Sequence, residues 1–210
     1  PLRYGCNPHQ TPARAYVRGA RLPFRILNGR VGYVNLLDAL NSWQLVRELH
    51  QATGLPSAAS FKHVSPSGAG LGLPLSESLR RAYRVEDLEL SPVATAYARA
   101  RGADRVCSFG DWVAVSEVVD VSLARLLQRE VSDGIIAPGY ETEALSTLSR
   151  KKNGAYVILE MDPEYQPPTI QTRDVFGITL EEKRNDVRLD LHVLEDVVTK
   201  NAEFTDAALR

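Results

Sequence analysis

The sequence is poor in cysteine and lacks long apolar runs. Among its 210 residues there are 2 cysteines, Cys6 and Cys107, which are too few for a disulfide framework or a four-cysteine zinc site. No stretch approaches the ~20 uninterrupted apolar residues that a membrane-spanning helix needs, and the first residues do not resemble a signal peptide. We therefore expect no membrane span and a cytoplasmic location.

Charge of one sign is not in excess either. The 25 Lys and Arg residues nearly balance the 26 Asp and Glu residues, so the formal net charge is -1. General binders of nucleic acid or membrane surfaces need a standing basic excess, and we expect neither as a partner. A hydrophobic share of 44% and a charged share of 24% are typical of a globular domain. The single methionine, Met161, leaves the chain without an initiator, which indicates a piece of a longer chain or a processed start.

Hydrophobic periodicity predicts helices that alternate with strands. Apolar residues at three- and four-residue spacings predict helices from residue 36, over 92–101 with Ser91 as N-cap, and over 122–130. Short apolar runs predict strands over 57–64, 132–140 and 154–161. Such alternation is typical of a layered α/β fold. From about residue 162 to 189 the pattern is less regular, and a helical pattern returns at 190–198.

The polar cluster FKHVSPSGAG, at 61–70, ends the first predicted strand with Lys62 and His63. Burial disfavours the charged form of a lysine, and histidine titrates near neutrality, so both could donate or accept protons. Pro66 predicts a tight turn over 65–68, since proline cannot continue an inner strand ladder. A lysine that extends to the surface beside a buried, hydrogen-bonded histidine is the alternative.

Three further clusters are polar. The loop RYGCNPHQ at 3–10 contains Arg3, which can bind a phosphate or carboxylate with two nitrogens, although a solvated terminal loop is the alternative. In CSFGDW at 107–112, Gly110 permits close backbone approach and Asp111 could orient a donor. Asp133 lies in SDGIIAPGY, where Asp-Gly is also typical of a plain turn. The sequence has no phosphate-binding loop, dinucleotide fingerprint, hydrolase elbow or zinc-ligand spacing.

Together these segments resemble the transformylase part of one bifunctional family of purine biosynthesis, AICAR transformylase/IMP cyclohydrolase. The resemblance runs along the whole chain and is carried by LRYGCNPHQTPA, LNGRVGYVNLLDALNSWQLVREL, AASFKHVSPSGAG, AYARARGADRVCSFGDWVA, REVSDGIIAPGYETEAL, LSRKKNGAYVILEMD and VVTKNAEFTDAALR. It implies that residues 1–210 form the first of two cytidine-deaminase-like halves, a layered αβα domain with a mixed sheet and no zinc site. The missing second half would complete the folate pocket.

The resemblance also implies roles for single residues. Lys62 and His63 would be catalytic, Lys62 in proton transfer and His63 at the attacking amine. Supporting residues would be His9, Phe109 and Asp111. The nucleotide would be bound by a larger set, in which Arg3 lies near the phosphate: Arg3, Tyr4, Asn28, His63, Gly110 and Asp133.

The activity implied is that of a phosphoribosylaminoimidazolecarboxamide (AICAR) formyltransferase. Such an enzyme transfers a formyl group from the co-substrate 10-formyltetrahydrofolate to AICAR in de novo purine (IMP) biosynthesis, and the resemblance implies no metal within this chain. It further implies a homodimer with the site at the subunit interface. The alternative is a non-catalytic purine-nucleotide-binding domain, because the folate half is missing.

Overall fold

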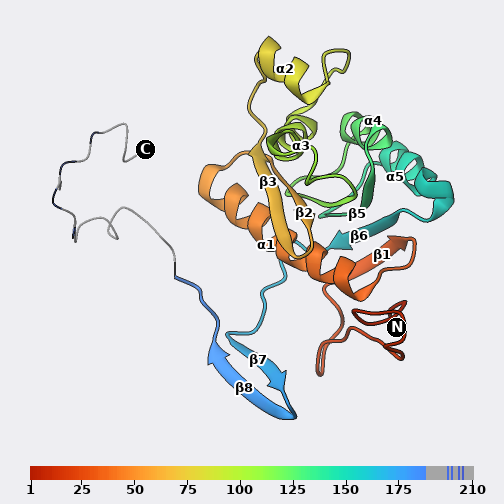
Figure 1. Cartoon of the computed structure of the whole chain (residues 1–210), viewed down its shortest axis with the longest axis vertical. Coiled ribbons are helices and arrows are strands. Elements are labelled where there is room, and N and C mark those ends of the chain that lie inside the picture. Colours follow the sequence, from red (N-terminus) through yellow and green to blue (C-terminus); the bar gives the residue numbers. More distant parts are fainter. Residues whose placement is uncertain (188–197, 199, 201–202, 204, 206–210) are drawn as a thin grey trace. The chain divides into compact units, whose positions relative to one another are not determined.

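The computed structural model describes residues 1–187 together with residues 198, 200, 203 and 205 (Figure 1). The chain divides into two compact units, Pro1–Tyr165 and Gln166–Arg210. The helical pattern expected over 190–198 lies outside the described residues, except for Val198. Among the helices that the structure describes, none is both long enough and apolar enough to cross a membrane.

The first unit is built on a six-stranded sheet with the strand order β1-β6-β5-β4-β2-β3. Strands β4, β5 and β6 are parallel, whereas β1, β2 and β3 each pair with a neighbour in the antiparallel direction. A mixed sheet flanked by helices confirms the predicted α/β class, and the cytidine-deaminase-like relationship stays a prediction. The strands are β1 (Phe24–Asn28), β2 (Ser57–Lys62), β3 (Ser65–Leu71), β4 (Asp111–Val115), β5 (Ser132–Ala137) and β6 (Val157–Met161).

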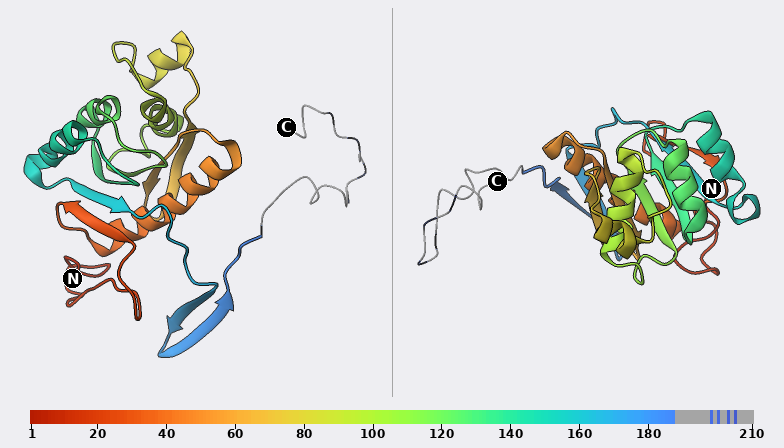
Figure 2. Two further views of the ribbon diagram at one scale, coloured as in Figure 1. Left: turned by 180° about the vertical axis from the view of Figure 1, so that it is seen from behind. Right: turned by 90° about the horizontal axis from the view of Figure 1, so that it is seen from above.

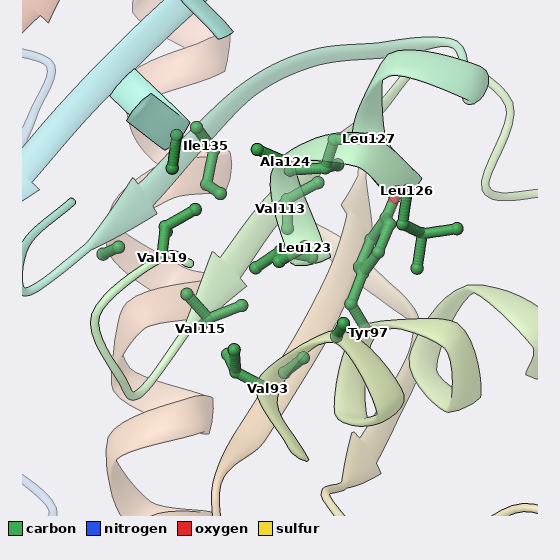
Figure 3. Close-up of a cluster of buried hydrophobic side chains, with 14 of the residues drawn as sticks. Val93, Tyr97, Val113, Val115, Val119, Leu123, Ala124, Leu126, Leu127 and Ile135 are labelled. Carbon is green, nitrogen blue, oxygen red and sulfur yellow. The ribbon is translucent and has the colours of Figure 1, made fainter. Parts of the chain in front are cut away.

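Helices cover both faces of this sheet. Alternate residues of a strand point to opposite faces, and two buried clusters follow from that alternation: Trp112 packs with Trp43 of α1, and Val113 packs with Tyr97 of α3. Figure 3 shows Tyr97 and the leucines of α4 between the helices and the strands. Figure 2 shows α4 and α5 side by side. The helices are α1 (Tyr33–Thr53), α2 (Glu77–Tyr83), α3 (Pro92–Ala103), α4 (Val121–Arg129) and α5 (Thr142–Ser149), followed by a short 3-10 helix at Lys151–Gly154.

Capping residues set where several helices begin. The hydroxyl of Ser91 accepts a hydrogen bond from Ala94 N, and Pro92 occupies the first turn of α3. The carboxylate of Asp120 accepts one from Leu123 N at 2.8 Å at the start of α4. The predicted helices at 92 and 122 are thereby confirmed, and α1 begins at Tyr33, before the predicted residue 36.

The predicted turn over 65–68 is wrong. Strand β2 ends at Lys62, the turn is His63–Val64, and Ser65–Leu71 returns as β3. Pro66 fits there because β3 lies at the edge of the sheet, and because the register shifts between Ser60 and Phe61, opposite this proline. The loss of one ladder donor is therefore tolerated.

Small residues let α3 lie directly on the edge strand β3. A Cβ atom added to Gly70 would lie 2.6 Å from Ala96 O, and one added to Gly72 would lie 2.7 Å from Pro92 O. Both distances are shorter than Cβ atoms show in folded proteins. We call Gly68, Gly70 and Gly72 the glycine seam, and it sets how closely α3 approaches the sheet.

The second unit contains one hairpin in its described part. Strand β7 (Ile170–Val175) pairs with β8 (Ile178–Lys183) through the turn Phe176–Gly177, where both residues have positive φ, 51° and 78°. This hairpin lies within the segment 162–189, for which the sequence predicts little regularity. Charged residues interrupt the apolar alternation that reveals a strand, for example Arg173 and Asp174 in β7.

Candidate functional site

Three of the predicted clusters meet at one end of the strands, which we call the sheet edge of the site and which is distinct from the edge strand β3. Because β2 runs antiparallel to β4, the end of β2 lies beside the beginning of β4, with Phe61 paired to Trp112. Strand β5 begins at the same edge, where Ser132 pairs with Asp111. The topology therefore places Lys62 next to Gly110, with Asp133 on the adjoining strand.

The ammonium group of Lys62 is held by two backbone carbonyls. Its Nζ donates to Phe109 O at 2.8 Å and to Gly110 O at 3.0 Å, and we call these two oxygens the carbonyl cradle. Gly110 has φ +73°, and a Cβ atom there would lie 2.8 Å from Lys62 Nζ. Glycine is therefore favoured at this position, because it adopts this backbone conformation without strain and leaves room for the end of the Lys62 side chain.

A buried polar network lies beneath the carbonyl cradle. Asp111 has no exposed surface, and its Oδ2 accepts from Ser60 Oγ at 2.7 Å while its Oδ1 accepts from Arg101 Nη1 at 2.9 Å. Arg101 Nη1 also donates to Ser108 O at 2.8 Å. Burial raises the pKa of Asp111 to about 6, and the nearby guanidinium of Arg101 opposes that rise. Asp111 therefore faces the interior, where it can fix the backbone of the loop.

His63 follows Lys62 in the exposed two-residue turn between β2 and β3. The next residue, Val64, donates its N–H to Asp38 Oδ1 of α1 at 2.6 Å, and Figure 1 shows this turn beside α1. Burial raises the pKa of Asp38, and the charges of His63 and Lys62 lower it. The sequence motifs did not point to Asp38, although an acidic residue within the apolar run Leu36–Leu40 was a usable signal.

Asp133 and Asn28 occupy the same edge. Asp133 Oδ1 pairs with Lys152 Nζ at 2.6 Å, and both side chains are close to half-exposed, so a ligand can reach the carboxylate. Asn28 ends β1 and donates from Nδ2 to Tyr156 O at 2.7 Å and to Gly154 O at 3.0 Å. Its amide nitrogen thus ties β1 to the start of β6.

Arg3 lies at the beginning of α1. Its Nη2 is 3.6 Å from the position that a Cβ atom of Gly32 would take, and Gly32 caps α1 without a side-chain hydrogen bond. Its guanidinium stacks on the Tyr4 ring at 4.8 Å and donates to Tyr4 Oη at 3.1 Å. A guanidinium beside the uncapped N–H groups of a helix N-terminus is suited to bind an anion.

For two predicted residues, Phe109 and His9, the described part of the structure shows no side-chain hydrogen bond that indicates a role. Phe109 is 64% exposed next to the carbonyl cradle. His9 is exposed in the loop at 5–10, and within the described residues its side chain makes no hydrogen bond to the strands of the sheet. Within the described residues, no group of three or more His, Cys, Asp and Glu side chains could hold a metal ion.

One apolar hollow lies away from these residues. It has a volume of about 360 Å³ and lies between the N-terminal segment and α1, where it is lined by apolar side chains such as Leu22, Phe24 and Leu40. None of the predicted site residues lines it. This hollow is therefore not part of the candidate site.

The comparison with known protein families decides the family. A family model described as AICARFT/IMPCHase bienzyme matches residues 1–210. The chain belongs to this family. The resemblance predicted from the sequence is thus confirmed, while the roles of single residues stay predictions.

Curated relatives agree with this assignment. The chain is 31% identical over 206 residues to the bifunctional purine biosynthesis protein PurH of Roseobacter denitrificans, covering 96% of this chain and 35% of the relative. It is 32% identical over 213 residues to PurH of Cereibacter sphaeroides, covering 99% of this chain and 36% of the relative. The chain therefore spans about a third of the length of the curated relatives that it matches.

Proposed function

We propose that this chain is the nucleotide-binding part of an AICAR formyltransferase. The observation that carries the proposal is the convergence of Lys62, His63 and Asp133 at one sheet edge, on the same side of the unit as the beginning of α1. Membership in a bienzyme family named for this transformylase supports it. The enzyme would transfer a formyl group from 10-formyltetrahydrofolate to the 5-amine of AICAR.

The arrangement suits a nucleoside monophosphate. The phosphate would bind to Arg3 and to the N-terminus of α1, with Tyr4 beside it. From Tyr33 to Asp38 the helix rises about 8 Å, at 1.5 Å per residue, which is comparable to the length of a ribose phosphate. The base would then lie near Gly110 and His63, and the ribose near Asp133 and Asn28.

The chemistry requires one base and one acid. The amine nitrogen forms a bond to the formyl carbon, and His63 takes the proton that this nitrogen loses. The Lys62 ammonium stabilises the oxyanion of the tetrahedral intermediate. When the bond between the formyl carbon and N10 of the folate breaks, Lys62 protonates the departing nitrogen. Phe109, Asp111 and His9 would support these groups without taking part in bond formation.

The proposal extends to the larger protein. Residues 1–210 would form the first of two cytidine-deaminase-like halves, and the rest of the folate pocket would come from the second half. The active enzyme would be a cytoplasmic homodimer with its site at the subunit interface. These statements follow from the family resemblance.

Nucleotide binding is tested first, on the 210-residue chain itself. Isothermal titration with AICAR should show saturable binding, and Arg3→Ala should weaken it at least tenfold, which is about 1.4 kcal/mol. The matched control is Arg18→Ala, an exposed arginine of the same N-terminal segment that lies outside the proposed site. Equal effects of the two substitutions would mean that only general charge is sensed and would contradict the proposed phosphate site.

Catalysis is tested by a formyl-transfer assay with the second transformylase half added in trans. We expect turnover in its presence, and we expect Lys62→Ala to abolish turnover while AICAR binding changes less than about threefold. Binding of AICAR without turnover in the reconstituted protein would favour the non-catalytic nucleotide-binding domain instead.

A further inference from the structure

The turn that presents His63 has an unfavourable sequence for its shape. Both of its residues have positive φ, 53° at His63 and 63° at Val64. Two-residue hairpin turns of this kind favour Asn-Gly, because side chains at positive φ meet the backbone. A β-branched valine in this region is an outlier that persists only when its surroundings hold it.

The second hairpin of the chain shows the same turn without the strain at its second residue. Phe176 and Gly177 also have positive φ, 51° and 78°, and a Cβ atom on Gly177 would meet nothing within 4 Å. Glycine takes this conformation without help. The contrast indicates that the turn containing Val64 depends on an outside contact that a glycine turn does not need.

That contact comes from Asp38. This residue is 6% exposed, and its Oδ1 accepts the Val64 N–H at 2.6 Å, which links α1 to the tip of the hairpin. A hydrogen bond from a backbone N–H to a carboxylate is shorter and stronger than one between neutral groups. Lys62 and Ser65, the pair that closes the hairpin, lie on either side of the turn.

We propose that Asp38 is a positioning residue, which holds the His63–Val64 turn in its left-handed conformation and so orients His63 beside Lys62. The proposal rests on the proposed function, because it concerns how His63 is presented to the nucleotide. Asp38 acts through the backbone of Val64 and makes no contact with the reacting atoms. Replacing Val64 by glycine should therefore remove the need for the carboxylate.

The experiment is a double-mutant cycle of Asp38→Ala and Val64→Gly. Amide hydrogen exchange of Lys62 and Ser65 reports the turn, and the ring resonances of His63, assigned with His63→Gln, report the histidine. Asp38→Ala should speed exchange at least tenfold and shift the His63 resonances. Adding Val64→Gly should bring both most of the way back. In the reconstituted transfer assay, Asp38→Ala should lower kcat at least tenfold with KM for AICAR nearly unchanged, and Val64→Gly should restore it.

Two further variants separate the possible roles. Asp38→Asn keeps an acceptor oxygen for Val64 N–H, so exchange and kcat should change less than about threefold. Asp120→Ala, which also removes a carboxylate from a backbone N–H but at the start of α4, should leave the His63 resonances unshifted. If Asp38→Asn is as damaging as Asp38→Ala and glycine at position 64 restores nothing, the carboxylate acts through its charge and the proposal is overturned. A wild-type chain that neither binds AICAR nor supports transfer would refute the proposed function, while the exchange cycle would still decide the role of Asp38 in the turn.

Discussion

Replacing Gly110 by alanine should separate the position of Lys62 from the stability of the fold. At φ +73°, a residue with a side chain costs about 1–2 kcal/mol in backbone strain. The new methyl group would also stand 2.8 Å from Lys62 Nζ, so the ammonium must leave the carbonyl cradle. Because Lys62 is only half-buried, water replaces the two carbonyls and the further loss of stability is small. We expect the free energy of unfolding to fall by about 2 kcal/mol in total.

The effect on catalysis should be much larger than the effect on stability. Displacing a catalytic group by about 1 Å can lower a rate about 100-fold. In the proposed transfer assay with the second half added, kcat should therefore fall by that order. Gly19→Ala is the matched control, because Gly19 has φ +72° and a Cβ atom there would meet nothing within 4 Å. It should lose the same 1–2 kcal/mol in urea denaturation while kcat stays unchanged. Equal rates for the two variants would refute the idea that the carbonyl cradle positions Lys62.

Three further predictions concern charge and packing. Because burial raises the pKa of Asp111 to about 6, the folded chain binds more protons than the unfolded chain between about pH 4 and 6. The free energy of unfolding, measured by urea denaturation, should then fall by up to about 3 kcal/mol as pH rises through this window. Asp111→Asn should remove this pH dependence. A free energy of unfolding that rises with pH in the wild-type chain would contradict the prediction. Gly70→Ala should lower the melting temperature by several degrees in calorimetry, because its methyl group would lie 2.6 Å from Ala96 O, and an unchanged value would contradict the close packing. Lys152→Ala should change AICAR affinity about threefold in titration, since it frees Asp133 from its ion pair, and no change would argue against ribose binding there.

Local sequence signals predicted much of the fold. Ser91 followed by proline marks the start of α3 because a hydroxyl cap and a fixed φ are both local requirements. The apolar run from Ser57 marks β2 for the same reason, since a strand buried on both faces needs apolar residues at nearly every position. Lys62 stands out because it ends that run.

Features that depend on tertiary partners escaped the sequence analysis. The edge position of β3 allows Pro66 in a strand, and edge position is decided by strand order. Asp38 stands out locally as an acidic residue in an apolar run, but its hydrogen bond to the left-handed Val64, 26 residues away, has no local signal. Asp111 faces inward because Arg101, from α3, is there to neutralise it. In each case the conformation or burial of a residue depends on a helix or strand that is distant in the sequence.

The glycine seam connects the edge strand β3, through α3, to the loop at 108–110. Helix α3 carries Arg101, whose guanidinium binds both Ser108 O and Asp111, and these flank the two carbonyls that hold Lys62. The distance between α3 and β3 therefore affects the position of the proposed catalytic lysine, and this distance leaves no room for one added methyl group. A larger residue at Gly70 would therefore move α3 away from β3 and shift the loop that holds Lys62, although no residue of the proposed site is replaced.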